Sequence, residues 1–325
     1  MNISRRLATL GLASSALFPM WAHAQSPLAN KQVRILVGFA AGGSTDILAR
    51  MVAERIGPDL GATAVVINKP GANGNIAAAE VARSAPDGLT LYMGSFNNPV
   101  NHAANRKLPF DFLKDFAPVA TVGYLPNVLI VNKDLPVKNV QELIALARSK
   151  PGSLSFGSSG AGSSQHMSAE LFKYLAKVDI VHVPFPGSAP AVTNLLGGHI
   201  GLLFDNIPTA AVQVKAGTVR ALAVTGSKRA PQLPDLPTVA QAGVPEFEVT
   251  SFFALYAPTG TPAAIVNSLN ASINKALADP AVKASMADKG IEAGGGTPQE
   301  TRALVEREVD KWRKVIQASG IKFED

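Results

Sequence analysis

One pattern occurs three times in this chain and limits what it can fold into: a short run of β-forming residues, a turn rich in glycine and serine, and a helix. The three copies lie at residues 33–56, 154–171 and 181–196. The start of a helix carries unpaired N–H donors and about half a positive charge, so such a turn can hold a carboxylate or a phosphate without a basic side chain. None of the three turns contains Lys or Arg. The pattern therefore favours a small anion held by backbone and hydroxyl groups over a polyanion held by charge.

Strands that alternate with helices predict a mostly parallel sheet with helices on both faces. In the first part of the chain, β-branched runs at 33–38 and 63–68 flank a helix at 45–56. Ligands of such sheets bind beyond the carboxyl ends of the strands. The turn at 42–45 and the strand end at Ser95 fall at that edge. Both are therefore candidates for ligand contact.

The same order of elements starts again after an irregular segment at 108–116, which indicates two similar lobes facing each other across a cleft. Two apolar, β-rich segments, 119–131 and 247–257, are candidates for the crossings between the lobes. We therefore predict an α/β fold with a cleft between two mixed sheets that are flanked by helices. The expected divisions are 25–125 for the first part of lobe 1, 126–249 for lobe 2 and 250–325 for the return to lobe 1. Two helices should finish the chain, the second with an apolar stripe formed by Leu304, Val305, Val309, Trp312 and Ile316.

The first 24 residues have the features of a signal peptide: Arg5 and Arg6, an apolar run, and an A-x-A site at residues 22–24. We expect the mature chain to begin at Gln25 and to be exported, and the sequence leaves open whether the route is the general or the twin-arginine pathway. Removing Arg5 and Arg6 lowers the formal charge of +6 by two. No Lys/Arg cluster interleaved with aromatic residues is present, so nucleic-acid binding is not expected. The chain has no cysteine, which excludes disulfides and thiolate chemistry.

Six motifs distributed along the chain resemble those of one family; they lie at residues 39–46, 68–75, 85–91, 156–163, 183–185 and 204–206. The sequence resembles the Bug family of periplasmic solute receptors, which serve tripartite tricarboxylate transporters. The resemblance covers essentially the whole mature chain. It implies a periplasmic-binding-protein fold of the Venus flytrap type (type II) that closes around a small carboxylic acid and then docks on the membrane permease subunits. It further implies that the ligand carboxylate lies between the first-lobe turn at 39–45 and the second-lobe turn at 158–163.

The candidate ligand-binding residues follow from these turns and strand ends. In the first lobe they are Phe39, Ala41, Gly42, Gly43, Ser44, Thr45, Ser95 and Asn97. In the second lobe they are Ser158, Ser159, Gly160, Ala161, Gly162, Ser163, His166, Pro184, Gly187 and Asp205. Asp46 is expected to complement the helix dipole rather than contact ligand. The histidines show no spacing typical of metal ligands, so neither a metal nor a cofactor is expected.

The sequence also bears on three other functions. Residues 157–161 nearly match the G-x-S-x-G motif of serine hydrolases, but the last glycine is missing and the order of Ser, Asp and His fits poorly. Gly160 and Gly162 are not followed by the third glycine of a dinucleotide-binding motif. A periplasmic sensor that passes ligand occupancy to a membrane partner is compatible with every feature above. For a receptor, the expected ligand is an aliphatic or aromatic mono- or dicarboxylate, and a monomer is expected.

Overall fold

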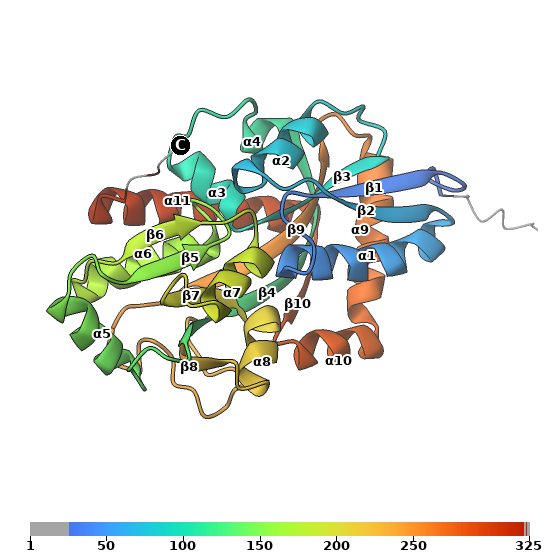
Figure 1. Ribbon diagram of the computed structural model, residues 1–325. Helices are drawn as coiled ribbons and strands as arrows, with labels where there is room; N and C mark the ends of the chain where they lie inside the picture. The colour runs from blue at the N-terminus through green and yellow to red at the C-terminus, as the bar shows by residue number, and fades with distance from the viewer. Residues whose placement is uncertain (1–25, 322, 324–325) are drawn as a thin grey trace, which may run out of the picture.

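The structure is a computed structural model that describes residues 26–321 and 323 (Figure 1). The expected signal peptide at 1–24 therefore lies outside the described residues. The described strands form one ten-stranded sheet in the order β2-β1-β3-β9-β4-β7-β5-β6, and β8 and β10 both pair with β4. The parallel pairs β1–β2, β1–β3, β5–β6 and β5–β7 are joined by antiparallel pairs that involve β4 and β9. The sheet is therefore mixed.

Strand β4 (Phe116–Asn132) is the element that links the two halves of this sheet. Residues up to Pro126 pair with β9 (Thr250–Pro258), whereas residues from Asn127 onward pair with β7 (Leu202–Asn206). We call the half with β1, β2, β3 and β9 the first lobe, and the half with β5, β6, β7 and β8 the second lobe. The register with β9 shifts twice, between Pro118 and Ala120 and between Thr121 and Gly123. Such bulges bend a strand, so β4 can serve both lobes without a break.

The first lobe is built from βα units and from segments that return late in the chain. Its parallel strands are β1 (Gln32–Val37), β2 (Thr63–Asn68) and β3 (Thr90–Ser95). The helices that follow these strands are α1 (Ser44–Leu60), α2 (Asn75–Ala82), α3 (Asn97–Ala103) and α4 (Phe112–Asp115), with a short 3-10 turn, η1 (Ala72–Gly74), before α2. After β9 come α9 (Ala263–Ala278), α10 (Pro280–Asp288), β10 (Glu292–Gly295) and α11 (Pro298–Ser319). The prediction of two final helices thus missed α10 and β10.

The second lobe repeats the strand–turn–helix order. Its remaining strands are β5 (Ser155–Ser158), β6 (Val181–Pro184) and β8 (Val219–Val224). Its helices are α5 (Val140–Ser149), α6 (Ser164–Ala176), α7 (Ser188–Leu196) and α8 (Ile207–Lys215). Both lobes place helix starts at the carboxyl ends of their parallel strands: α1, α2 and α3 follow β1, β2 and β3, and α6, α7 and α8 follow β5, β6 and β7. The three glycine- and serine-rich turns of the sequence are the connections that lead into α1, α6 and α7.

The last helix joins the two lobes on the side seen behind the sheet in Figure 1. Its predicted apolar stripe is confirmed in part, since Val305, Val309 and Trp312 are buried. Trp312 is fully buried and packs edge-on against Phe96, with ring centroids 4.9 Å apart. Phe96 and Trp312 belong to the same hydrophobic cluster as second-lobe residues such as Phe156. α11 therefore anchors the end of β3 to the core of the second lobe. No described helix is both long enough and apolar enough to cross a membrane.

Candidate ligand-binding site

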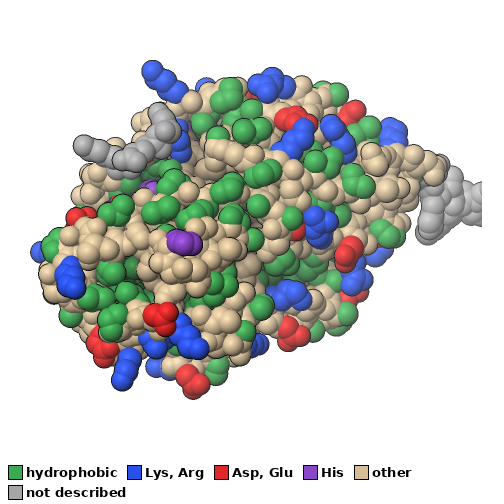
Figure 2. Space-filling view, in the orientation of Figure 1, with side chains coloured by type: hydrophobic (Ala, Val, Ile, Leu, Met, Phe, Trp, Pro, Cys, Tyr) green, Lys and Arg blue, Asp and Glu red, His purple; other side chains and the backbone are tan. Residues whose placement is uncertain are grey.

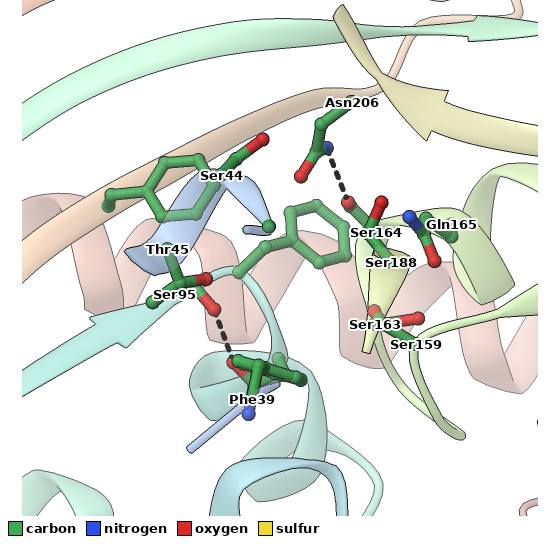
Figure 3. Close-up of a pocket in the computed structure, with 14 residues that line it drawn as sticks. Phe39, Ser44, Thr45, Ser95, Ser159, Ser163, Ser164, Gln165, Ser188 and Asn206 are labelled. Carbon is green, nitrogen blue, oxygen red and sulfur yellow. Dashed lines mark hydrogen bonds between the residues drawn. The ribbon is translucent and has the colours of Figure 1, made fainter. Parts of the chain in front are cut away.

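A cavity lies where the helix starts of the two lobes meet. It has an empty volume of about 400 Å³, part of which is open to solvent. Figure 3 shows the labelled residues of the first lobe on one side and those of the second lobe on the other. Its lining consists of small polar side chains and three phenylalanines: Phe39, Gly43, Ser44, Thr45, Ser95, Phe96, Asn97, Ser159, Ser163, Ser164, Gln165, Ser188, Asn206 and Phe253. No charged side chain is among these described lining residues.

Several helices begin at this cavity, which gives it a positive potential without any cation. Ser44 and Thr45 open α1, Gln165 lies at the start of α6, Ser188 opens α7, and Asn206 is the N-cap of α8. The N-caps of α1, α7 and α8 make no side-chain capping hydrogen bond. Unpaired N–H groups at helix starts favour an anion. The cavity is therefore suited to a carboxylate.

Charged side chains lie elsewhere. On the face shown in Figure 2, Lys and Arg are interspersed with Asp and Glu, and they form no extended patch of one sign.

The turn of the first lobe is held in shape by Asp46, behind the cavity. Its Oδ2 accepts a hydrogen bond from the Gly42 N–H at 3.0 Å, and its Oδ1 accepts one from Asn68 Nδ2 at 3.0 Å. Arg50 pairs with the same carboxylate. Burial opposes ionisation of Asp46, but the hydrogen bonds from Arg50, Gly42 and Asn68 outweigh burial and hold its pKa below the ordinary value. Asp46 is thus a structural residue of this turn, as the sequence indicated.

Asp205 supports the second-lobe side of the cavity in a similar way. Its side chain is fully buried. Oδ1 accepts from Gln165 Nε2 at 2.6 Å and from Ser188 Oγ at 2.5 Å, while Oδ2 accepts from Thr209 Oγ1 at 2.5 Å. Burial raises the pKa of Asp205 to about 6 against the effect of these hydrogen bonds. Asp205 is one of the predicted ligand-binding residues; in the structure it stands behind Gln165 and Ser188 and is not among the residues that line the cavity.

Asn206 connects the cavity to the strands that cross between the lobes. Its Nδ2 donates to Asn127 Oδ1 at 2.5 Å, and it lies 3.3 Å from Ser164 Oγ and 3.4 Å from Ser251 Oγ. Asn127 belongs to β4 and Ser251 to β9. The position of α8 relative to both crossing strands is therefore fixed by one buried amide.

Direct contacts between the lobes surround the cavity. Asn73 Nδ2 donates to the Ala161 carbonyl at 2.6 Å, and Arg106 Nη1 lies 3.3 Å from the same oxygen. On another side, the Ala40 N–H donates to the Pro186 carbonyl at 3.2 Å. The lobes are thus joined by hydrogen bonds of the protein itself.

Three of the predicted site glycines lie at this seam rather than at the cavity. A Cβ on Gly160 would lie 3.1 Å from Asn73 Cβ, and one on Gly162 would lie 2.8 Å from Asn101 Oδ1. A Cβ on Gly187 would lie 3.1 Å from the Ala40 nitrogen. These glycines allow the backbones of the two lobes to approach closely.

His166 and Ser158 lie outside the cavity, in a cluster with His182. Ser158 Oγ accepts from the Gly160 N–H and lies 2.6 Å from His182 Nε2. The rings of His166 and His182 are 4.3 Å apart, and His166 also lies 5.8 Å from Phe323. Burial lowers the pKa of His182 to about 4, and burial lowers that of His166 well below its ordinary value. Both imidazoles are therefore neutral at pH 7.

The cavity lining includes eight of the predicted site residues: Phe39, Gly43, Ser44, Thr45, Ser95, Asn97, Ser159 and Ser163. It does not include Ala41, Gly42, Ser158, Gly160, Ala161, Gly162, His166, Pro184, Gly187 or Asp205. It adds residues that the candidate set lacked, namely Phe96, Ser164, Gln165, Ser188, Asn206 and Phe253. Ser164, Gln165 and Ser188 are the first residues of helices that follow predicted turns, and this position could have identified them. Within residues 26–321 and 323, no group of three or more metal-ligating side chains occurs.

Comparisons with known proteins identify the family of the chain. The family model described as "Tripartite tricarboxylate transporter family receptor" matches residues 48–321. The chain is 35% identical to the Protein BugT of Bordetella pertussis over 325 residues, which cover 99% of this chain and 100% of the relative.

Two solved structures share the fold. The structure titled "R. palustris Rpa4515 with adipate" is 42% identical, covers 90% of this chain and 99% of its own, and superposes with a TM-score of 0.87. MatC (Rpa3494) from Rhodopseudomonas palustris, with bound malate, is 35% identical, covers 88% of this chain and 99% of its own, and has a TM-score of 0.85. The predicted two-lobed periplasmic-binding fold is thus confirmed. The chain belongs to the tripartite tricarboxylate transporter receptor family, which includes the Bug proteins, and its members are solute-binding receptors and not enzymes.

Proposed function

We propose that the protein is an exported periplasmic receptor that binds a small organic carboxylate between its two lobes and delivers it to the membrane subunits of a tripartite tricarboxylate-type transporter. The observation that carries this proposal is the convergence of the starts of α1, α6, α7 and α8 on a cavity whose described lining residues include no charged side chain. The adipate and malate in the two related structures support a carboxylate as the ligand.

The mechanism is closure biased by the ligand. A solute that touches both lobes stabilises the closed form by its greater affinity for that form. Ser44, Thr45 and Ser95 contact the ligand from the first lobe, and Ser159 and Ser163 contact it from the second. Behind the cavity, Asp46 holds the turn that leads into α1 through the Gly42 N–H, and Asp205 holds Gln165 and Ser188.

The binding part of the proposal is tested by thermal shift and calorimetry with the mature protein and a panel of mono-, di- and tricarboxylic acids. A ligand that binds only the native state at a hundredfold excess over its Kd stabilises by about 2.7 kcal/mol. Ser159→Asp places a negative charge at the cavity and should abolish binding. Ser285→Asp puts the same charge on an exposed position of α10 and serves as the control. Unchanged affinity in Ser159→Asp would contradict the anion site.

Delivery and export need separate measurements. Vesicles that contain the transporter's membrane subunits should accumulate the solute only when the loaded receptor is added. Binding without any stimulation of uptake would overturn the delivery step and favour a sensor. Export predicts that the protein recovered from the periplasm begins at Gln25.

A further inference from the structure

Asp205 is a fully buried carboxyl group that has no cationic partner among the described residues. It accepts hydrogen bonds from Gln165 Nε2 and Ser188 Oγ, and both of these residues line the cavity. Thr209 Oγ1 and the backbone of Asn206 hold it from the start of α8. The first turns of α6, α7 and α8 thus meet at one carboxyl group of the protein itself, directly behind the wall of the cavity.

The two carboxyl groups behind the cavity differ in what surrounds them. In the first lobe, Asp46 pairs with the Arg50 guanidinium, and its pKa stays below the ordinary value although burial opposes this. In the second lobe, Asp205 accepts only from neutral donors, and burial raises its pKa to about 6. Asp46 therefore stays ionised near neutral pH, whereas Asp205 is able to exchange a proton there.

The hydrogen bonds around Asp205 accommodate both of its protonation states. In the ionised form, Thr209 Oγ1 donates to Oδ2 at 2.5 Å. The same hydroxyl lies 2.9 Å from the Asn206 carbonyl oxygen. A protonated Oδ2 can donate to Thr209 Oγ1 while Thr209 donates to that carbonyl, because a hydroxyl offers one donor and two lone pairs. Oδ1 accepts from Gln165 and Ser188 in both states, so the wall of the cavity keeps its shape.

Other titratable groups near Asp205 are few. The elements that pack most closely against β7 are β4, β5, α6, α7 and α8. β5 and α7 carry no titratable side chain, and the other three carry Tyr124, His166, Glu170, Lys173, Tyr174 and Lys215. Burial keeps the pKa of His166 well below its ordinary value, and Glu170 pairs with Lys173. None of these six is among the described groups that shift the pKa of Asp205.

We propose that ligand binding is coupled to protonation of Asp205: the receptor takes up one proton from solvent on this carboxyl group when an anion fills the cavity, and the protonated receptor binds the anion more tightly. This inference rests on the proposed function and adds a form of regulation to the same site. An anion against Gln165 or Ser188 stands one side chain away from Asp205 and displaces water from that wall. A nearby like charge and a loss of solvent both favour the neutral form of a carboxyl group. By linkage, protonation raises the affinity for the anion by the same factor.

Calorimetry on the wild-type protein tests the coupling, with whichever acid of the carboxylate panel binds most tightly, adipate and malate included. We take a coupling of about tenfold, which is typical of two linked sites, and a pKa of about 6 for Asp205 in the empty receptor. Kd should then fall about fivefold when the pH is lowered from 8.5 to 6, and binding at pH 6.5 should take up about half a proton. Heats of binding in buffers of different ionisation enthalpy measure this uptake. Protonation of the ligand would act in the opposite direction, because the helix starts favour the anion.

Two variants locate the proton. Asp205→Asn resembles the protonated form, because its amide oxygen can accept from Gln165 and Ser188 and its amide nitrogen can donate to Thr209 Oγ1. It should bind at pH 8.5 with about the affinity that the wild type has at pH 6, and it should take up no proton. Asp235→Asn makes the same exchange at an exposed position and should keep the pH dependence.

A second readout needs no variant. The infrared difference spectrum of the wild type at pH 6.5, loaded minus empty, should gain a band of a protonated carboxyl group. A Kd that stays constant or rises as the pH is lowered, binding without proton uptake, or the absence of this band would overturn the inference, as would uptake that persists in Asp205→Asn. If Ser159→Asp abolishes the binding, such results leave the proposed function intact. If no carboxylate binds at all, the proposed function fails and the inference fails with it.

Discussion

The hydrogen bonds between the lobes predict that ligand affinity depends on a residue that does not line the cavity. Asn73 Nδ2 donates to the Ala161 carbonyl across the seam at 2.6 Å. The φ angle of Asn73 is 51°, in the left-handed region, so glycine is the substitution that removes its side chain without backbone strain. Asn73→Gly should destabilise the closed form relative to the open form, because this hydrogen bond joins the two lobes.

The expected size follows from the energy of one neutral hydrogen bond, about 0.5–1.5 kcal/mol. Arg106 also lies 3.3 Å from the Ala161 oxygen, so this carbonyl keeps a donor in the variant. We therefore expect a loss near 1 kcal/mol, which raises the apparent Kd about fivefold when the open form dominates without ligand.

Calorimetry with the strongest ligand of the panel measures the effect, and small-angle scattering reports the extent of closure. Asn105→Gly is a matched control: Asn105 also has a φ of 51° but is exposed. It should leave Kd unchanged. Equal Kd values for Asn73→Gly and the wild type, or an equal loss in Asn105→Gly, would refute the reasoning.

Two further predictions concern stability. Trp312→Ala should lower the free energy of unfolding by about 3–5 kcal/mol in a urea titration, because it truncates a fully buried side chain that packs on Phe96; Trp312→Phe should cost clearly less, and equal losses would contradict this packing argument. The contributions of Asp205 and His182 to the free energy of unfolding should depend on pH in opposite directions. The pKa of Asp205 is raised to about 6 by burial, so its contribution to stability is present below about pH 4 and is lost as the pH rises through 6. The pKa of His182 is lowered to about 4, so its contribution is present above about pH 6.5 and is lost as the pH falls toward 4. When the pH is lowered from 7.5 to 4.5, the free energy of unfolding of Asp205→Asn should therefore fall more than that of the wild type, and that of His182→Phe should fall less. Denaturant titrations at the two pH values measure these changes. The reverse order would contradict the pKa shifts of the two groups.

The regular elements were predictable where the sequence pattern is strong and local. The strand Thr63–Asn68 has the predicted bounds, and three of the five residues of the predicted α11 stripe are buried. β4 was harder to predict, because Gly123 and Pro126 resemble strand breakers, whereas the strand continues through both, with a register shift between Thr121 and Gly123. The seven residues of α3 carry too little periodicity to indicate a helix.

The site was predictable at the level of its turns but not of its side chains. Ser159 and Ser163 line the cavity as expected, whereas Gly160 and Gly162, in the same turn, face the other lobe. Which side of a turn meets a ligand depends on how the lobes pack, and a single strand–turn–helix segment does not contain that information. The side chain of Gln165 is held by a hydrogen bond to Asp205, which lies forty residues later in the chain.

The cavity that we propose for an anion offers dipoles fixed in the backbone instead of charged side chains, and this has a consequence for where the protein can work. Attraction between exposed charges weakens as dissolved salt accumulates around them, over a Debye length of about 10 Å at 0.1 M. Helix starts in direct contact with an enclosed solute are shielded from that effect, and no counterion has to leave a lysine or an arginine when the solute enters. A receptor built in this way should bind its solute almost equally well in fresh water and in brine.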